Sequence, residues 1–248
     1  MRSEDLFFEL SHPKRSAILV LLRQQPLRLS PLAERTGISP PEVTRHLHRL
    51  ARLGLIERRA EHVTALTGYG RVVSEFLPSF EFLVRHHEFL REHDLSGLPR
   101  QFLHRLDELA EPEVGEDVAD TMRHLDAVLG EAREFAWLMG SIPVLPEEAI
   151  VREARRAAIT VRIIVPPRLV PPGPRRRRHD PPFDRIEVRT LPEIPMGIAM
   201  NEQLAGIGVP DRRGRIDLTT GMRGRSVPFR QWCRDLFEHY WAIARPLR

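Results

Sequence analysis

The residues best suited to chemistry form the polar face of one predicted helix, in the segment PPEVTRHLHRLAR at residues 40–52. Its apolar residues Val43, Leu47 and Leu50 recur at intervals of four and three, the spacing of a helix that buries one face. A guanidinium can donate two hydrogen bonds to guanine O6 and N7, and hydroxyl and imidazole groups bond to bases or phosphates. The opposite face carries such groups and consists of Pro41, Thr44, Arg45, His48, Arg49 and Arg52. This face predicts contact with nucleic acid, with Thr44 and Arg45 nearest the base edges.

Two shorter segments before this helix are expected to position it. The segment HPKRSAILVLLRQQ predicts a helix with Ser11 as its N-cap, which ends before Pro26. A second, short helix is expected to open at Ser30 and to end in a turn at Gly37. The order helix, short helix and turn favours a helix-turn-helix.

The predicted DNA-reading helix has clear start and stop signals. Ser39 and Glu42 have the spacing of a capping box, and the prolines after Ser39 fit a first helical turn. Gly54 ends the helix, and LIERR and HVTAL then predict two short strands around Arg59–Glu61. This hairpin is expected to be a wing that contacts phosphates or the minor groove through Arg58, Arg59 and His62. The alternative is a small helical bundle without a nucleic-acid role.

Several segments resemble a known family. LSHPKRSAILVLL, PLAERTGISPPEVTRHLHRLARLGLIERR and ALTGYGRVVSEFLP resemble the winged-helix domain of archaeal regulators related to the ArsR group. LVRHHEFLREHDLSGLPRQFLHRLDEL resembles archaeal regulators of the FilR (methanogenesis-regulator) type, whose C-terminal half is similar to TrmB-like regulators and to a degenerate phospholipase-D-like fold. The resemblance implies a transcription factor with a C-terminal effector-sensing domain. The cysteines of ArsR-type metal sensors are missing, so it does not imply metal sensing.

A helix after the wing is expected to connect the domains and to form a dimer. From Tyr69 onward, apolar residues step by four and three, as in a heptad seam. The seam is formed by Val73, Phe76, Phe80 and Leu83. A homodimer would place two reading helices about one DNA turn apart. The alternative is packing of this stripe on its own domain. Pro78 is expected to kink the helix. We expect no metal at the nearby histidines, because His87 fills a place in the seam and His86 and His93 are expected in solvent.

The remaining chain predicts an α/β domain. VADTMRHLDAVLGEAR reads as a helix, EFAWLM as a strand, LPEEAIVREARR as a helix and ITVRIIV as a strand parallel to the first. IEVRTL, MGIAMN, QLAGIGV and GRIDLTT add strands, the middle two as a hairpin, and a buried helix closes the chain. The predicted fold is α+β, with a winged helix-turn-helix at 1–77, a helical linker and dimerisation region at 78–111 and an α/β effector-sensing domain at 112–248.

A small-molecule effector is expected at the carboxyl ends of the strands, where open α/β sheets bind ligands. The candidates are Trp137, Met139, Ser141, Met196, Met200 and Asn201. Ordinary core or loop packing is the competing interpretation. Arg175–Arg178 would clamp an anionic ligand or DNA, or simply lie in a solvated loop.

Composition argues against an enzyme. Lys14 is the only lysine, so no later lysine can act in a phosphodiesterase His-x-Lys pair, and PMGIAMNEQLAG offers neither group. We expect no catalytic residues, metal or cofactor, and a buried structural thiol at Cys233, the only cysteine.

Charge and hydropathy favour a regulator in the cytoplasm. The pI of about 10.1 favours a polyanionic partner, here double-stranded DNA, although the net charge of +4 alone does not establish one. No run of about 18 apolar residues is present and MRSEDLFFEL lacks a signal-peptide pattern, so we expect no membrane association. The alternatives are a nucleoid-type architectural protein, disfavoured by the capped helix with Thr44 and Arg45, and a phosphodiesterase-like enzyme.

Overall fold

The computed structural model describes residues 2–110, 112–141, 147–170 and 183–247, and the chain divides into two units, Met1–Glu81 and Phe82–Arg248. The boundary falls inside helix α6 (Leu77–Arg85). The expected separate linker at 78–111 differs from this division, because Leu98, Phe102 and Leu106 are buried in the core of the second unit. From Phe82 onward, the stretch therefore belongs to the second unit.

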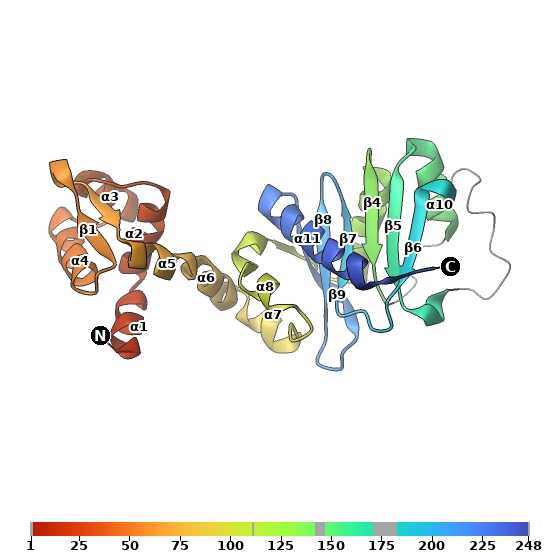
Figure 1. Ribbon diagram of the computed structural model, residues 1–248, viewed down its shortest axis with the longest axis horizontal. Coiled ribbons are helices and arrows are strands. Elements are labelled where there is room, and N and C mark those ends of the chain that lie inside the picture. The colour runs from red at the N-terminus through yellow and green to blue at the C-terminus, as the bar shows by residue number, and fades with distance from the viewer. Residues whose placement is uncertain (1, 111, 142–146, 171–182, 248) are drawn as a thin grey trace. The chain divides into compact units, whose positions relative to one another are not determined.

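Helices form most of the first unit, with a small hairpin after them (Figure 1). The helices are α1 (Ser3–Leu10), α2 (Pro13–Gln24), α3 (Leu29–Thr36) and α4 (Pro40–Arg52). The hairpin joins β1 (Ile56–Arg58) to β2 (Thr64–Leu66) in antiparallel pairing, with the short 3-10 helix η1 (Ala60–His62) between them. Helix α5 (Gly68–Glu75) follows. The predicted helices and the predicted pair of strands are confirmed.

One apolar core holds these elements together. Ile18 and Leu19 of α2, Leu32 of α3, and Val43 and Leu50 of α4 are fully buried in it. The expected inward face of α4 is thus confirmed, with Leu47 partly buried against the same core. Burial of such side chains contributes about 1.5–3 kcal/mol each, so this core fixes how α4 lies on α2 and α3.

Three glycines of the first unit occupy positions that a larger residue would strain. Gly37 (φ +65°) ends α3 and Gly54 (φ +70°) follows α4, both in the left-handed region that a glycine adopts without strain. Gly70 serves a different purpose, because a Cβ atom there would lie 1.7 Å from the carbonyl oxygen of Leu55. Only glycine lets α5 approach the chain after α4 this closely.

Two helix starts differ from the sequence prediction. The N-cap of α2 is His12, whose Nδ1 accepts a hydrogen bond from the Lys14 backbone N–H at 3.2 Å. Ser11 instead is the C-cap of α1, a helix that the pattern did not predict. Helix α3 begins at Leu29, ahead of the expected Ser30.

The expected connecting helix is divided into segments. Helix α5 ends at Glu75, α6 covers Leu77–Arg85 and α7 covers His87–Glu92. The kink expected at Pro78 is thus a break just before it. Proline has no N–H to donate four residues back and its ring clashes with that carbonyl, so the helix is interrupted there.

The second unit contains an eight-stranded mixed sheet in the order β10-β6-β5-β4-β7-β8-β9-β3. The strands are β3 (Glu113–Val114), β4 (Phe135–Met139), β5 (Thr160–Val165), β6 (Ile186–Thr190), β7 (Gly197–Asn201), β8 (Ala205–Pro210), β9 (Ile216–Gly224) and β10 (Arg245–Pro246). Strands β4, β5 and β6 pair in parallel, and β7 pairs antiparallel with both β4 and β8. The predicted parallel pair and hairpin are confirmed.

Helices cover both faces of this sheet. Helix α11 (Val227–Ile243) packs on one face, where Trp137, Met200 and Trp232 share a core. Helices α9 (Val118–Gly130) and α10 (Glu147–Ala157) belong to the other face, where Leu125 and Leu138 share a second core. Figure 1 shows α11 crossing the sheet in blue. Cys233 is a buried free thiol on α11, as expected.

Candidate nucleic-acid interface and ligand cavity

The start of α4 is fixed by a capping box. The Ser39 backbone N–H and hydroxyl both donate to Glu42 Oε2, at 3.1 and 2.7 Å. These bonds from Ser39 lower the pKa of the Glu42 carboxyl. A capped first turn holds the exposed backbone N–H groups of α4 in a defined position, so the side chains just after it also have a defined direction.

The predicted base-reading residues lie on the outward side of α4. Arg45 has 76% of its side chain exposed, and its guanidinium lies 3.9 Å from the Glu42 carboxylate. Pro41 and His48 are exposed as well. Thr44 is half-buried, and its Oγ1 donates to the Pro40 carbonyl at 2.9 Å. Its hydroxyl oxygen keeps an acceptor role, but its proton already has a partner.

Two contacts connect α2 to the turn before α4 and to α4 itself. Lys14 Nζ donates to the Thr36 carbonyl at 2.7 Å, which ties α2 to the last residue of α3. His46 packs on the His12 ring with a centroid separation of 4.6 Å, and burial lowers the pKa of His46. His46 of α4 therefore packs against His12, the N-cap of α2.

Arg49, a predicted DNA contact, has partners within the first unit. Its guanidinium forms an ion pair with Glu9 of α1, with Nη2 2.6 Å from Oε1, and it lies 5.4 Å from the Phe8 ring centroid. The hydrogen bond between them lowers the pKa of Glu9 and raises that of Arg49. Glu9 also pairs with the buried Arg15 at 2.8 Å. This arrangement favours a packing role for Arg49 that links α4 to α1.

The wing residues are exposed but have partners within the unit. Arg59 Nε donates to Glu57 Oε1 at 3.0 Å, and Arg58 Nη2 lies 3.1 Å from His62 Nδ1. Arg28 pairs with Glu61 at 2.7 Å, so it joins the wing although the sequence did not suggest it. Exposed ion pairs contribute about 0–1 kcal/mol. A DNA phosphate can therefore replace these partners at little cost.

The predicted dimer residues separate into two groups. Val73 is half-buried and packs against the core of its own unit. Phe76, Phe80 and Leu83 are 49%, 52% and 38% exposed. Val72 is 61% exposed and precedes Phe76 by four residues. The exposed apolar stripe therefore includes Val72 in place of the expected Val73.

The predicted ligand residues do not form one site. Trp137, Met196 and Met200 are buried in the core beneath α11. Asn201 is fully buried, and its side chain donates to the Val128 carbonyl and accepts from backbone N–H groups of the β7–β8 turn. These four were expected to line a pocket and are structural instead. Arg175–Arg178 lie outside the described residues.

Met139 and Ser141 do line a cavity, on the α9 side of the sheet. Its volume is about 90 Å³, and glycines of β7, β8 and β9 form much of its wall. The sequence prediction missed this cavity. The signal was the run of glycines inside strands, which often marks close approach of another group.

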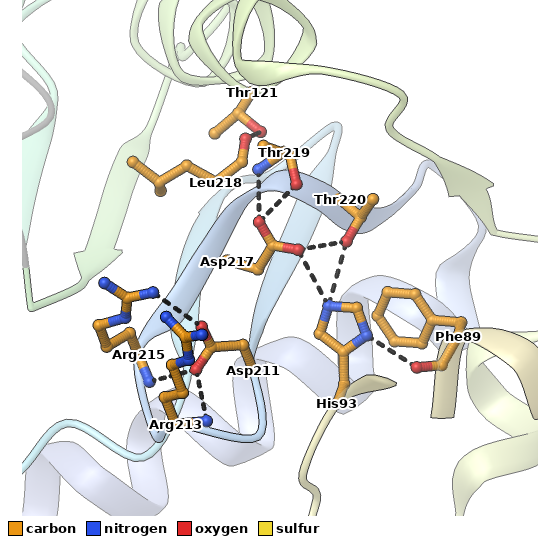
Figure 2. Close-up of polar contacts among 10 residues, drawn as sticks. All are labelled: Phe89, His93, Thr121, Asp211, Arg213, Arg215, Asp217, Leu218, Thr219 and Thr220. Carbon is orange, nitrogen blue, oxygen red and sulfur yellow. Dashed lines mark hydrogen bonds and ion pairs between the residues drawn. The ribbon is translucent and has the colours of Figure 1, made fainter. Parts of the chain in front are cut away.

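His93 was expected in solvent and is buried instead. Its side chain is 5% exposed, and Nε2 lies 3.2 Å from Asp217 Oδ2 while Nδ1 lies 2.7 Å from the Phe89 carbonyl oxygen. Figure 2 shows the imidazole between Phe89 and the Asp217–Thr220 pair. Within the described ranges, no group of three or more His, Cys, Asp or Glu side chains is placed to hold a metal ion.

The first unit has the elements of one class of protein. A helix-turn-helix with a capped second helix, followed by a hairpin wing, defines a winged helix-turn-helix domain. Residues 12–58 match the family model described as bacterial regulatory protein, arsR family. The chain is therefore a DNA-binding transcription regulator with an ArsR-type helix-turn-helix. No helix in the described part of the chain is long and apolar enough to cross a membrane.

Comparison with solved structures found partial likenesses. TrmBL2, an archaeal chromatin protein, is 15% identical, with 99% of this chain and 100% of that chain covered and a TM-score of 0.46. ZitR of Lactococcus lactis is 27% identical over 31% of this chain and 56% of its own, with a TM-score of 0.28. The dimethyltransferase RosA of Streptomyces davawensis is 16% identical over 75% and 63%, with a TM-score of 0.27. With TM-scores below 0.5, these likenesses carry no functional argument. A search of curated proteins found no match.

Proposed function

We propose that this regulator reads a specific sequence in double-stranded DNA through α4, acts as a homodimer, and changes its DNA affinity when a small effector binds the second unit. One observation carries the DNA-reading part: Arg45 stands 76% exposed just after a capped helix start. In a helix-turn-helix, residues near the start of the second helix reach the base edges of the major groove.

The homodimer is supported by apolar exposure on α5 and α6. Val72, Phe76 and Phe80 follow one another at intervals of four, and each is about half exposed or more. Exposed apolar groups at helical spacing favour pairing with a second helix. The resemblance to FilR-type regulators supports a sensor role for the second unit, and the absence of lysine after Lys14 favours binding over phosphodiester chemistry there.

Two arginine variants test the reading of DNA. An operator is first selected from random duplexes with the full chain. Arg45→Ala should then weaken operator binding by about 1–3 kcal/mol and relax preference at one base pair. Arg59→Ala, the matched control in the wing, should weaken binding to all duplexes and lower the slope of log affinity against log salt by about one.

The outcome separates the two DNA-binding classes. Equal losses on operator and random DNA for Arg45→Ala would remove Arg45 from direct reading. Failure to enrich any sequence, with tight binding to all duplexes, would favour a nucleoid-type architectural protein.

A further inference from the structure

The hairpin formed by β8 and β9 ends in an arginine-rich tip, residues 211–215, with the sequence DRRGR. Arg212 and Arg215 have 63% and 69% of their side chains exposed, and Arg213 is exposed as well. Within residues 205–224, all of which the structure describes, no large apolar side chain is exposed. The tip therefore presents cationic groups without an apolar surface in the same hairpin.

The backbone of the tip is held by Asp211. Its Oδ1 accepts hydrogen bonds from the backbone N–H groups of Arg213 and Arg215, at 2.8 and 3.0 Å, and Figure 2 shows these bonds meeting at the carboxylate. The Gly214 N–H donates to the Asp211 carbonyl at 2.9 Å, and Gly214 has a φ of +74°, which a glycine adopts without strain. The arginine side chains thus project from a well-defined turn.

The guanidinium groups of the tip have weak partners or none. Arg215 Nη2 lies 3.4 Å from Asp211 Oδ2, and Arg212 Nη2 lies 3.6 Å from Glu92 Oε1. The Arg213 side chain has no hydrogen bond or ion pair among the described residues. Exposed ion pairs contribute little to stability. A phosphate can therefore replace the two acids and can bind Arg213 without breaking any contact.

A fourth arginine belongs to the helix beside the tip. Arg212 Nε donates to the Arg91 carbonyl at 2.7 Å, so the tip lies against the end of α7. The Arg91 side chain is exposed and has no ion pair among the residues that the structure describes. Asp94 follows α7, and its carboxylate already accepts from the N–H and hydroxyl of Ser96. Arg91 and Arg213 therefore leave positive charge unpaired in this region.

The tip is attached to the segment that leads to the first unit. His93, directly after α7, pairs with Asp211 in a β-bridge, and the Asp94 N–H donates to the Pro210 carbonyl at 2.9 Å. About 12 residues, most of them helical, separate His93 from the unit boundary at Glu81, a path of about 18 Å along the chain. One turn of DNA measures about 34 Å. A flanking duplex of about one turn is therefore long enough to span this path.

DNA matches this surface better than an acidic protein does. Phosphates need only cationic donors, and a guanidinium can bind one with two parallel hydrogen bonds. Protein interfaces have apolar and aromatic cores inside a polar rim, and the hairpin exposes no large apolar residue. The wing of the first unit has a similar arrangement, in which a short hairpin presents Arg58 and Arg59 beside Glu57.

We propose that the tip of the β8–β9 hairpin is a second DNA contact, in which Arg212, Arg213 and Arg215 bind backbone phosphates of the duplex that flanks the operator. The proposal rests on the proposed reading of DNA by α4. It adds a contact from the second unit that does not depend on base sequence. Such a contact lengthens the bound duplex and makes binding more sensitive to salt.

Two duplexes test the contact with the full chain. Both contain the selected operator, and the longer one carries about 15 further base pairs of unrelated sequence at each end, about one and a half turns. The natural protein should bind the longer duplex about threefold or more tightly, with a steeper slope of log affinity against log salt. Equal affinity and equal slope on the two duplexes would overturn the proposal.

Variants assign the effect to the tip. Arg213→Gln removes a side chain without a partner, so the fold should not change. It should bind the longer duplex about threefold or more weakly, with a slope lower by about one for each tip on the DNA, and should bind the operator alone as before. Adding Arg212→Gln and Arg215→Gln should remove the gain from the flanks.

Arg155→Gln is the matched control. Arg155 is an exposed arginine of α10 without an ion pair in the described part of the chain, so this variant makes the same change of charge. It should bind both duplexes like the natural protein. Equal losses for Arg155→Gln and Arg213→Gln would show an effect of net charge and would overturn the contact at the tip.

Directed cleavage locates the tip on the DNA. Cys233 is buried, so an iron chelate that reacts with exposed thiols can be attached at Arg213→Cys. It should cut the flanking duplex outside the segment that the first unit protects, and the same chelate at Arg155→Cys should not. Absence of these cuts, with Arg213→Gln bound to DNA like the natural protein, would overturn the proposal in favour of an acidic protein as the partner of the tip.

The results separate this proposal from the proposed function, because the operator alone reports on α4 and the flanks report on the tip. Where no operator is enriched, random duplexes of the same two lengths are used. A loss in Arg213→Gln on the longer random duplex would then support the tip contact while specific reading by α4 is refuted. Specific binding of the operator without any effect of the flanks would do the reverse.

Discussion

Replacing His124 with glutamine should remove an acid-sensitive part of the stability of the second unit. His124 lies on α9, and its Nε2 is 3.2 Å from the Ala199 carbonyl oxygen. Burial lowers its pKa from 6.5 to about 4; the hydrogen bond to Ala199 and the charge of Glu131 oppose this shift, and the charges of Arg223 and Arg225 add to it. The unfolded chain therefore binds more protons than the folded chain between these values. Stability is present above pH 6.5 and is lost as the pH falls toward 4.

The size of this loss follows from the shift. At about 1.36 kcal/mol per pKa unit, the full effect is about 3 kcal/mol, of which about 2 kcal/mol is lost between about pH 7.5 and pH 5. Trp137, Trp232 and Trp241 are all buried in the second unit, so their fluorescence reports its unfolding by urea without a signal from the first unit. His124→Gln should be less stable than the natural protein at pH 7.5 and should lose less stability on acidification. A difference between the two proteins that stays constant with pH would refute the buried, neutral histidine.

The remaining predictions concern the first unit. Gly70→Ala should destabilise it by about 3 kcal/mol or more, because its Cβ would strike a backbone carbonyl, while Gly68→Ala, with open space around its Cβ, should change little in thermal melts followed by circular dichroism. Phe80→Glu should give a folded monomer by light scattering, and a persistent dimer would place the interface elsewhere. Arg49→Met should lower the stability of the first unit and leave the salt slope of DNA binding unchanged. Arg52→Met should lower the slope by about one, and the reverse result for the two arginines would restore Arg49 as a phosphate contact.

The sequence predicted α4 well because its signals are local. The Ser39–Glu42 box, the prolines after it and the glycine after its end lie within a few residues of the helix, so each could be recognised without tertiary information. The break of the connecting helix was only half predicted. The heptad spacing continues across Pro78, and the backbone cost of that proline outweighed the apolar pattern.

Trp137 was misplaced as a ligand residue because β4 is buried on both faces. Trp137 and Met139 meet the α11 core, while Ala136 and Leu138 meet the α9 core, and all of them are apolar. A strand without alternation does not indicate which face has a cavity. The prediction that His93 is exposed was wrong for another reason. Its partner Asp217 lies 124 residues away in the sequence, so the residues next to His93 do not indicate this contact.

The sequence also does not indicate which arginines of the first unit contact DNA, since 37 of the chain's 38 basic residues are arginines and only Lys14 is a lysine. A planar guanidinium serves equally in a buried ion pair, on an aromatic ring and on a phosphate. The groups that each guanidinium contacts in the structure distinguish these roles. Arg15 is buried against Glu9, and Arg162 lies 5.2 Å from the rings of both Trp137 and Trp241. Arg45 projects from α4 without such a contact closer than 3.9 Å. An arginine scan scored only by lost DNA binding would mix these groups, because unfolding and lost readout both reduce it. The ratio of operator to random-DNA affinity distinguishes them, since only a residue that touches bases changes that ratio.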